Sequence, residues 1–106
     1  MEKSLFETYL EMAVGPQKIT NLGTAKREID KLVNQKMTAI KLKKDKIKKQ
    51  DGEEYINVKF GPALKKLLYE KISYEDIGKI EKSFVKAGWD RAHIGEDMDE
   101  IDLFFK

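Results

Sequence analysis

The chain has 106 residues, of which 41% are hydrophobic and 38% are charged, and its net charge of +2 does not force extension, so we predict one folded domain. It has no cysteine, which excludes disulfides and thiolate metal sites and fits a reducing compartment. No apolar run approaches the ~18 to 20 residues that span a membrane, and acidic residues interrupt the N-terminal apolar pattern. We therefore expect a cytoplasmic protein with no membrane anchor and no signal peptide.

The first part of the chain has two segments with helical periodicity. The first segment ends before Pro16, and residues 17–22 then favour a short helical turn. Gly23 is expected to reverse the chain, and Thr24 to cap a second full helix that reaches Lys36. The expected buried face of this second helix is Ala25, Ile29, Leu32 and Val33, and its expected outward face is Lys26, Arg27, Asp30, Lys31 and Asn34.

After this helix the apolar residues follow a period of two. Ile40 and Leu42 alternate with lysines, and a similar alternation returns beyond Asp51-Gly52. An Asp-Gly pair between two such runs is a strong signal for a two-residue hairpin turn. We therefore predict a β-hairpin over residues 37–60. Ile47 is out of step with the first run, so either a bulge precedes it or the apolar ladder stops there.

Two more helices and a strand are predicted in the second half of the chain. Pro62 is a typical first residue of a helix, Ser73 is the expected cap of the next helix, and Gly88 is expected to end it. The final apolar residues alternate again and predict a strand that pairs with residues 91–94. This order of elements places the protein in the α+β class.

The order of helix, short turn, helix and hairpin in residues 1–60 resembles the winged helix–turn–helix family of DNA-binding domains. The residues that carry the resemblance are 17–22 as a short second helix, Gly23-Thr24 as the turn, 24–36 as the recognition helix and 37–60 as the wing. Membership implies that the recognition helix enters the major groove and that the wing follows phosphates. The implied DNA-binding residues are Thr24, Lys26, Arg27 and Lys31 on the helix, and Lys41, Lys43, Lys44, Lys46, Lys48 and Lys49 on the wing.

The lysines of the predicted wing have two interpretations. Residues 36–49 contain seven lysines and one acid, Asp45. Lysines that neutralise phosphates release counterions, which gives DNA binding a steep dependence on salt. A solvated, lysine-rich hairpin also protects a sheet edge against aggregation without binding anything.

We hypothesise that the protein binds double-stranded DNA as an accessory or regulatory factor of transcription, replication or conjugation, in a plasmid or phage context. The resemblance implies a homodimer, for which residues 61–106 are the expected dimerisation or docking unit. The alternative is a small protein-binding α+β module, an inhibitor or an adaptor, whose lysine-rich hairpin contacts an acidic partner.

The acidic stretch near the C-terminus has three interpretations. Asp97, Asp99 and Asp102 supply oxygens for a metal ion, but their spacing is not that of an EF-hand loop. The last residues also resemble the sliding-clamp-binding peptides of replication proteins, which place an aliphatic residue before aromatics. The favoured interpretation is a half-buried strand, for which a dimer interface is one expected position. The expected protein-binding residues are Ile101, Leu103, Phe104 and Phe105.

No pattern of catalytic residues is present. His93 is the only histidine, so a histidine-based triad or metal cluster would have to borrow residues from another chain. The glycines are isolated and form no phosphate-binding loop. We therefore expect no enzyme activity, no cofactor and no bound metal.

Overall fold

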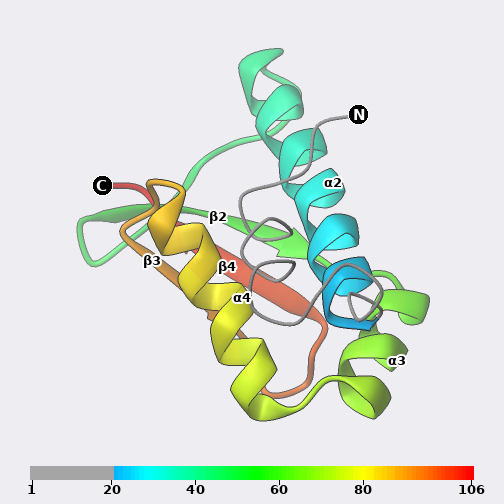
Figure 1. Cartoon of the computed structure of the whole chain (residues 1–106). Coiled ribbons are helices and arrows are strands. Elements are labelled where there is room, and N and C mark those ends of the chain that lie inside the picture. The colour runs from blue at the N-terminus through cyan, green and yellow to red at the C-terminus, as the bar shows by residue number, and fades with distance from the viewer. Residues whose placement is uncertain (1–20) are drawn as a thin grey trace.

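The computed structural model describes residues 21–106, which form three helices and four strands (Figure 1). The helix predicted before Pro16 lies outside the described residues. In chain order the elements are α2 (Asn21–Lys41), β1 (Lys48–Gln50), β2 (Glu53–Lys59), α3 (Pro62–Lys71), α4 (Tyr74–Lys86), β3 (Arg91–Ile94) and β4 (Glu100–Phe104). The α+β class is confirmed.

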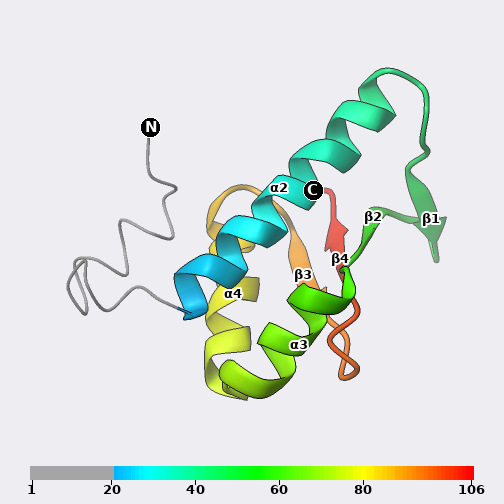
Figure 2. The same cartoon turned by 90° about the vertical axis from the view of Figure 1, so that its right-hand side faces the viewer.

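The four strands form one antiparallel sheet in the order β1-β2-β4-β3. The C-terminal strand β4 is central, and its inward residues Ile101 and Leu103 face Val58 and Ile56 of β2. The helices α2, α3 and α4 lie on one side of the sheet, and no helix of the described residues covers the other side (Figure 2). This second side is called the outer face below.

One hydrophobic core joins the two halves of the chain. It combines α2, β2, α3, α4, β3 and β4 through Ala25, Ile29, Val33, Ile56, Val58, Phe60, Leu64, Leu68, Ile72, Ile77, Ile80, Phe84, Ile94, Met98, Ile101 and Leu103. Because β4 inserts between β2 and β3, residues 61–106 share this core with the preceding elements. This shared core agrees with the single domain that the sequence predicts.

Several local signals gave the right elements. Asp51 and Gly52 have φ of 53° and 81°, as a type I′ hairpin turn requires, and they join β1 to β2. Ser73 accepts a hydrogen bond from the backbone N–H of Asp76 and begins α4. Gly88, with φ of 121°, follows the end of the same helix. The predicted pairing of the terminal strand with residues 91–94 is also confirmed.

The predicted turn at Gly23-Thr24 is wrong. Both residues lie inside α2, which is continuous from Asn21 to Lys41. Gly23 is buried inside this helix and does not mark a chain reversal. The helix that was expected to begin at Thr24 is therefore part of a longer one, and the helix–turn–helix arrangement at this point is not observed.

The predicted wing is also too long. Residues 37–41 continue α2, and Ile40 belongs to this helix although it alternates with lysines. Leu42 follows in a turn and is 59% exposed. The strands of the hairpin are only Lys48–Gln50 and Glu53–Lys59. Ile47 is out of step because it precedes the first strand, and no bulge is needed to explain it.

Within residues 21–106, no helix has the length and the apolar character needed to cross a lipid bilayer.

Candidate functional site

Residues 41–49, which we call the basic arch, connect the C-terminal end of α2 to β1 (Figure 2). Its six lysines, Lys41, Lys43, Lys44, Lys46, Lys48 and Lys49, are all exposed. The lysines predicted for a wing therefore lie together on the surface, but on a helix end, a turn and a short edge strand. Only Lys48 and Lys49 belong to a strand.

The basic arch begins where α2 closes in a Schellman motif. The backbone N–H of Lys43 donates to the carbonyl of Ile40 over 3.0 Å, and that of Lys44 donates to the carbonyl of Ala39 over 2.8 Å. Lys43 has φ of 60°, in the left-handed region where glycine usually ends such helices. Lys43 therefore occupies a position at which a glycine would have less backbone strain. Lysines in the last turn also interact favourably with the helix dipole.

An ion pair ties the basic arch to α2. Asp45 Oδ2 lies 2.6 Å from Lys36 Nζ, and Asp45 Oδ1 accepts a hydrogen bond from the backbone N–H of Lys46 over 2.7 Å. The hydrogen bond from Lys36, helped by the one from Lys46, lowers the pKa of Asp45 below its ordinary value of 3.8. The only acid of the basic arch is thus engaged by a lysine outside it.

Other lysines of the molecule form ion pairs with acids. Lys59 Nζ pairs with Glu100 across β2 and β4, and Lys79 Nζ lies 3.5 Å from Asp76 Oδ1 on α4. No comparable pair with a carboxylate of residues 21–106 forms at the six lysines of the basic arch. This distinguishes the basic arch from a surface on which lysines and acids neutralise one another.

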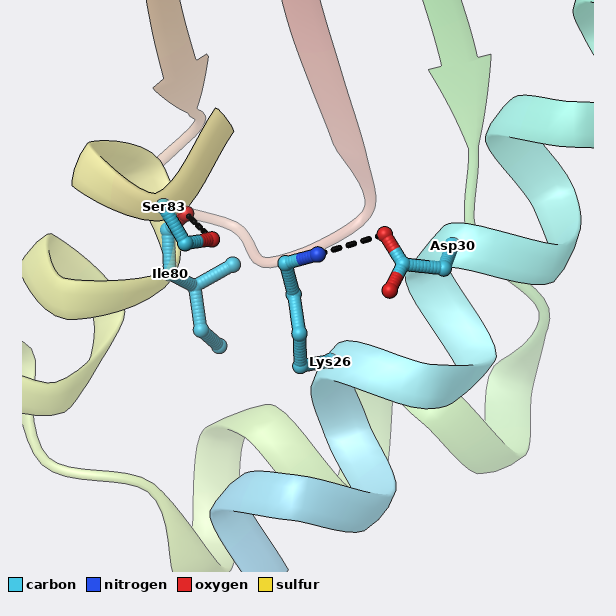
Figure 3. Close-up of polar contacts among 4 residues, drawn as sticks. All are labelled: Lys26, Asp30, Ile80 and Ser83. Carbon is cyan, nitrogen blue, oxygen red and sulfur yellow. Dashed lines mark hydrogen bonds and ion pairs between the residues drawn. The ribbon is translucent and has the colours of Figure 1, made fainter. Parts of the chain in front are cut away.

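Lys26 was predicted to face DNA, but it is buried. Its Nζ lies 2.5 Å from Asp30 Oδ1 and 4.2 Å from the centroid of the Phe84 ring. Figure 3 shows it in the space between α2 and α4, beside Ile80 and Ser83, whose hydroxyl donates to the Ile80 carbonyl. Its side chain is 7% exposed, so it stabilises the contact between these helices.

The remaining helix residues predicted to bind DNA lie far from the basic arch. Thr24, Arg27 and Lys31 are exposed, and Lys31 Nζ lies 3.2 Å from Glu28 Oε1. At about 1.5 Å rise per residue, Thr24 and Lys41 are about 26 Å apart along α2. The fold therefore does not combine the two predicted groups into one compact surface.

The four C-terminal residues predicted to bind a protein have different environments. Ile101 and Leu103 are fully buried in the central strand, which corrects their assignment to a binding surface. The Phe105 ring packs 4.9 Å from that of Trp89. Phe104 projects from the outer face. The aliphatic and aromatic residues that resemble a clamp-binding peptide are therefore alternating inward and outward residues of the central strand β4.

The outer face carries a row of side chains that the sequence did not reveal. Tyr55 pairs in register with Lys48 on one side and with Phe104 on the other, and Phe104 pairs with Arg91. The Tyr55 and Phe104 rings are stacked, with centroids 5.2 Å apart and an interplanar angle of 29°. The guanidinium of Arg91 lies 4.0 Å from the Phe104 centroid. We call these four residues the outer row. The alternation of apolar residues in each strand indicates that Tyr55 and Phe104 point away from the core. It does not indicate that the two rings are neighbours, because this depends on the order of the strands in the sheet.

His93 contributes to a sheet edge. It is exposed, and its Nδ1 lies 3.8 Å from Glu81 Oε2 of α4. The same carboxylate accepts the backbone N–H of Ile94 over 2.8 Å. Glu81 thereby occupies a donor of the edge strand β3 that another chain would otherwise use. Within the described part of the chain, no three side chains converge as metal ligands.

No family model matches the sequence, and neither the search of characterised proteins nor that of solved structures finds a similar one.

Proposed function

We propose that the protein binds DNA through its phosphates, with the basic arch as the binding surface. The observation that supports this proposal is the clustering of six exposed lysines in nine residues, with the single acid among them paired to Lys36. A polyanion gains free energy at such a surface mainly by releasing its condensed counterions. Duplex DNA, with one negative charge per about 1.7 Å, is a dense and extended source of such charge.

The chemistry of lysine indicates binding without strong sequence preference. An ammonium group is a point charge on a flexible stem and lacks the two-pronged geometry with which arginine recognises guanine. The basic arch contains no arginine. Its contacts would place the duplex against the protein and would contribute little to base discrimination. This supports an accessory role in which the protein coats or stabilises DNA.

The experiment measures the anisotropy of a labelled duplex of mixed sequence at low salt. The test variant reverses three charges in the basic arch, at Lys41, Lys44 and Lys46, each to Glu. The control variant makes the same net charge change elsewhere, at the exposed Lys66, Lys71 and Lys82. We expect the test variant to lose at least about tenfold in affinity, and the control to lose much less, because phosphate contacts are local at the surface.

Two outcomes would overturn the proposal. One is that the wild-type protein does not bind the duplex even at low salt. The other is that both variants weaken binding equally, which would mean that only the total charge matters. Polyglutamate as a competitor addresses an acidic protein partner, because preferential binding of this peptide over DNA would also contradict the proposal.

A further inference from the structure

We propose that the outer row binds an unpaired nucleobase on the ring of Tyr55, so that the DNA bound by this protein includes single-stranded segments. This inference rests on the proposed function, since it assigns a second contact to the same ligand. Lys48 links the two surfaces, because it belongs both to the basic arch and to the outer row. The preferred ligand is then a strand whose phosphates contact lysines and whose base stacks on the sheet.

Among residues 21–106, Phe104 is the only residue whose ring or cation packs on the Tyr55 ring, which leaves the second face of Tyr55 for a ligand. Phe104 lies between Tyr55 and Arg91, which approach it from neighbouring strands on opposite sides. Both faces of the Phe104 ring are therefore occupied. Tyr55 uses one face for Phe104, and its other face is directed toward β1, where Lys48 is the partner in register. A base inserted there would extend an existing stack, and base–aromatic stacking tolerates any sequence.

An ion pair orients Arg91 over the Phe104 ring. Arg91 donates from its guanidinium to Glu53 Oε2 over 2.6 Å while lying over the Phe104 ring. This ion pair spans β3 and β2 and passes over β4 between them. Because Arg91 is engaged in this way, it positions the aromatic rings and is not counted among the phosphate ligands. A rigid stacking surface loses little conformational entropy when a base binds.

Charge on the outer face restricts where a strand can lie. Glu100 and Asp102 lie on β4 beyond the outer row, where Lys59 and Asn57 bind them. These carboxylates disfavour phosphates along that part of the face. At the other end of the strand, the exposed Lys106 lies two residues after Phe104. A polyanion is therefore favoured at the outer row, next to the basic arch, and disfavoured over the rest of the outer face.

The competing explanation is that the outer row only stabilises the sheet. Cross-strand aromatic and cation–aromatic contacts do contribute to sheet stability. Stability alone cannot separate the two explanations, because the substitution of Tyr55 affects both. The experiment therefore compares ligands that differ in whether they offer an unpaired base.

The probes are three labelled molecules of equal length: oligothymidylate of about 12 nucleotides, an abasic strand with the same phosphates, and a duplex. The test variant is Tyr55→Leu, which keeps apolar bulk and removes the aromatic face. Tyr55→Phe retains the face, and Tyr74→Leu removes an aromatic ring that is exposed on α4 instead. Thermal unfolding of each variant verifies that it is folded at the temperature of the binding assay.

We expect Tyr55→Leu to weaken oligothymidylate binding by about 5- to 150-fold, the range for loss of one stacked base. Binding of the abasic strand and of the duplex should change less than about twofold, since their phosphates meet the same lysines. Tyr55→Phe and Tyr74→Leu should bind as the wild type does.

The inference is wrong if folded Tyr55→Leu binds oligothymidylate as the wild type does, or if it loses affinity for all three probes equally. In either case binding of the duplex by the wild-type protein would still support the role of the basic arch. If the wild-type protein binds none of the three probes, the proposed function fails together with this inference.

Discussion

Lys43 occupies a left-handed backbone position, with φ of 60°, at which a residue without Cβ is more stable. We predict that Lys43→Gly stabilises the protein by about 1 kcal/mol, because it relieves this strain. In a domain of this size that corresponds to an increase of about 4–8 °C in Tm. The same variant should reduce the log–log salt slope of DNA binding by about 0.9, since one phosphate contact is lost. A variant that is less stable would show that the Lys43 side chain itself stabilises the end of α2.

Lys26 illustrates a cation whose role is structural. We predict that Lys26→Ala costs about 2 kcal/mol in unfolding free energy, measured by denaturant titration, because it leaves Asp30 without this partner and removes a packed side chain. The loss lies below that of a fully buried pair because the Asp30 side chain is 29% exposed. Lys26→Met keeps the apolar stem and should cost less. If Lys26→Met is folded yet binds DNA more weakly than the wild type, the original assignment of Lys26 to DNA binding would regain support.

At the scale of elements, β2 and β4 are joined by an ion pair that titrates. Lys59 lowers the pKa of Glu100 from 4.5, mainly through a hydrogen bond, and Glu100 raises the pKa of Lys59 from 10.5. Glu100 therefore stabilises the fold above pH 4.5, and this contribution disappears as the pH falls through its lowered pKa. The contribution of Lys59 is present below pH 10.5 and disappears as the pH rises through its raised pKa.

We predict from this pair that Glu100→Gln is less stable than the wild type between pH 4.5 and 10.5, and that the difference shrinks in acid. The effect is small, because the Lys59 side chain is 72% exposed. Unfolding in denaturant, repeated over a pH series, measures it. A difference that grows below pH 4.5 would have the wrong sign for this ion pair.

The position of β4 predicts the result of truncation. Removal of residues 102–106 deletes Leu103, whose side chain is fully buried in the core. It also removes part of the strand pairing of β4 with β2 and with β3. We expect the truncated chain to be unfolded by circular dichroism, whereas removal of Lys106 alone should leave the fold intact. A folded chain without residues 102–106 would instead indicate a dispensable docking tail.

The elements that the sequence predicted correctly depend on short-range signals. The turn at Asp51-Gly52, the cap at Ser73 and the helix end at Gly88 each require only a few neighbouring residues. The errors arose where one pattern fits two structures. Ile40 and its neighbours alternate with lysines and also suit a helix, and Gly23 suits both a turn and a tightly packed helix. In these places packing against the core decided the outcome.

At the scale of the whole molecule, the sheet order determines which surface residues become neighbours. Tyr55 and Phe104 are far apart in sequence, and they stack because β4 inserts beside β2. Local periodicity contains no information about this pairing, so the outer row was not predicted. The six lysines of the basic arch were predicted because they are consecutive or nearly so along the chain. The cluster can be identified without knowledge of any tertiary contact, but the backbone conformation of these residues could not be predicted in this way.

The most direct test of the proposed function is the salt dependence of duplex binding, measured by anisotropy over a series of salt concentrations. Six phosphate contacts from the basic arch predict a log–log slope of about −5 for the wild-type protein. The triple variant at Lys41, Lys44 and Lys46 removes about half of these contacts and should show a slope of about −2.5 or shallower. A slope near zero for the wild type, or equal slopes for the two proteins, would contradict the assignment of DNA binding to the basic arch.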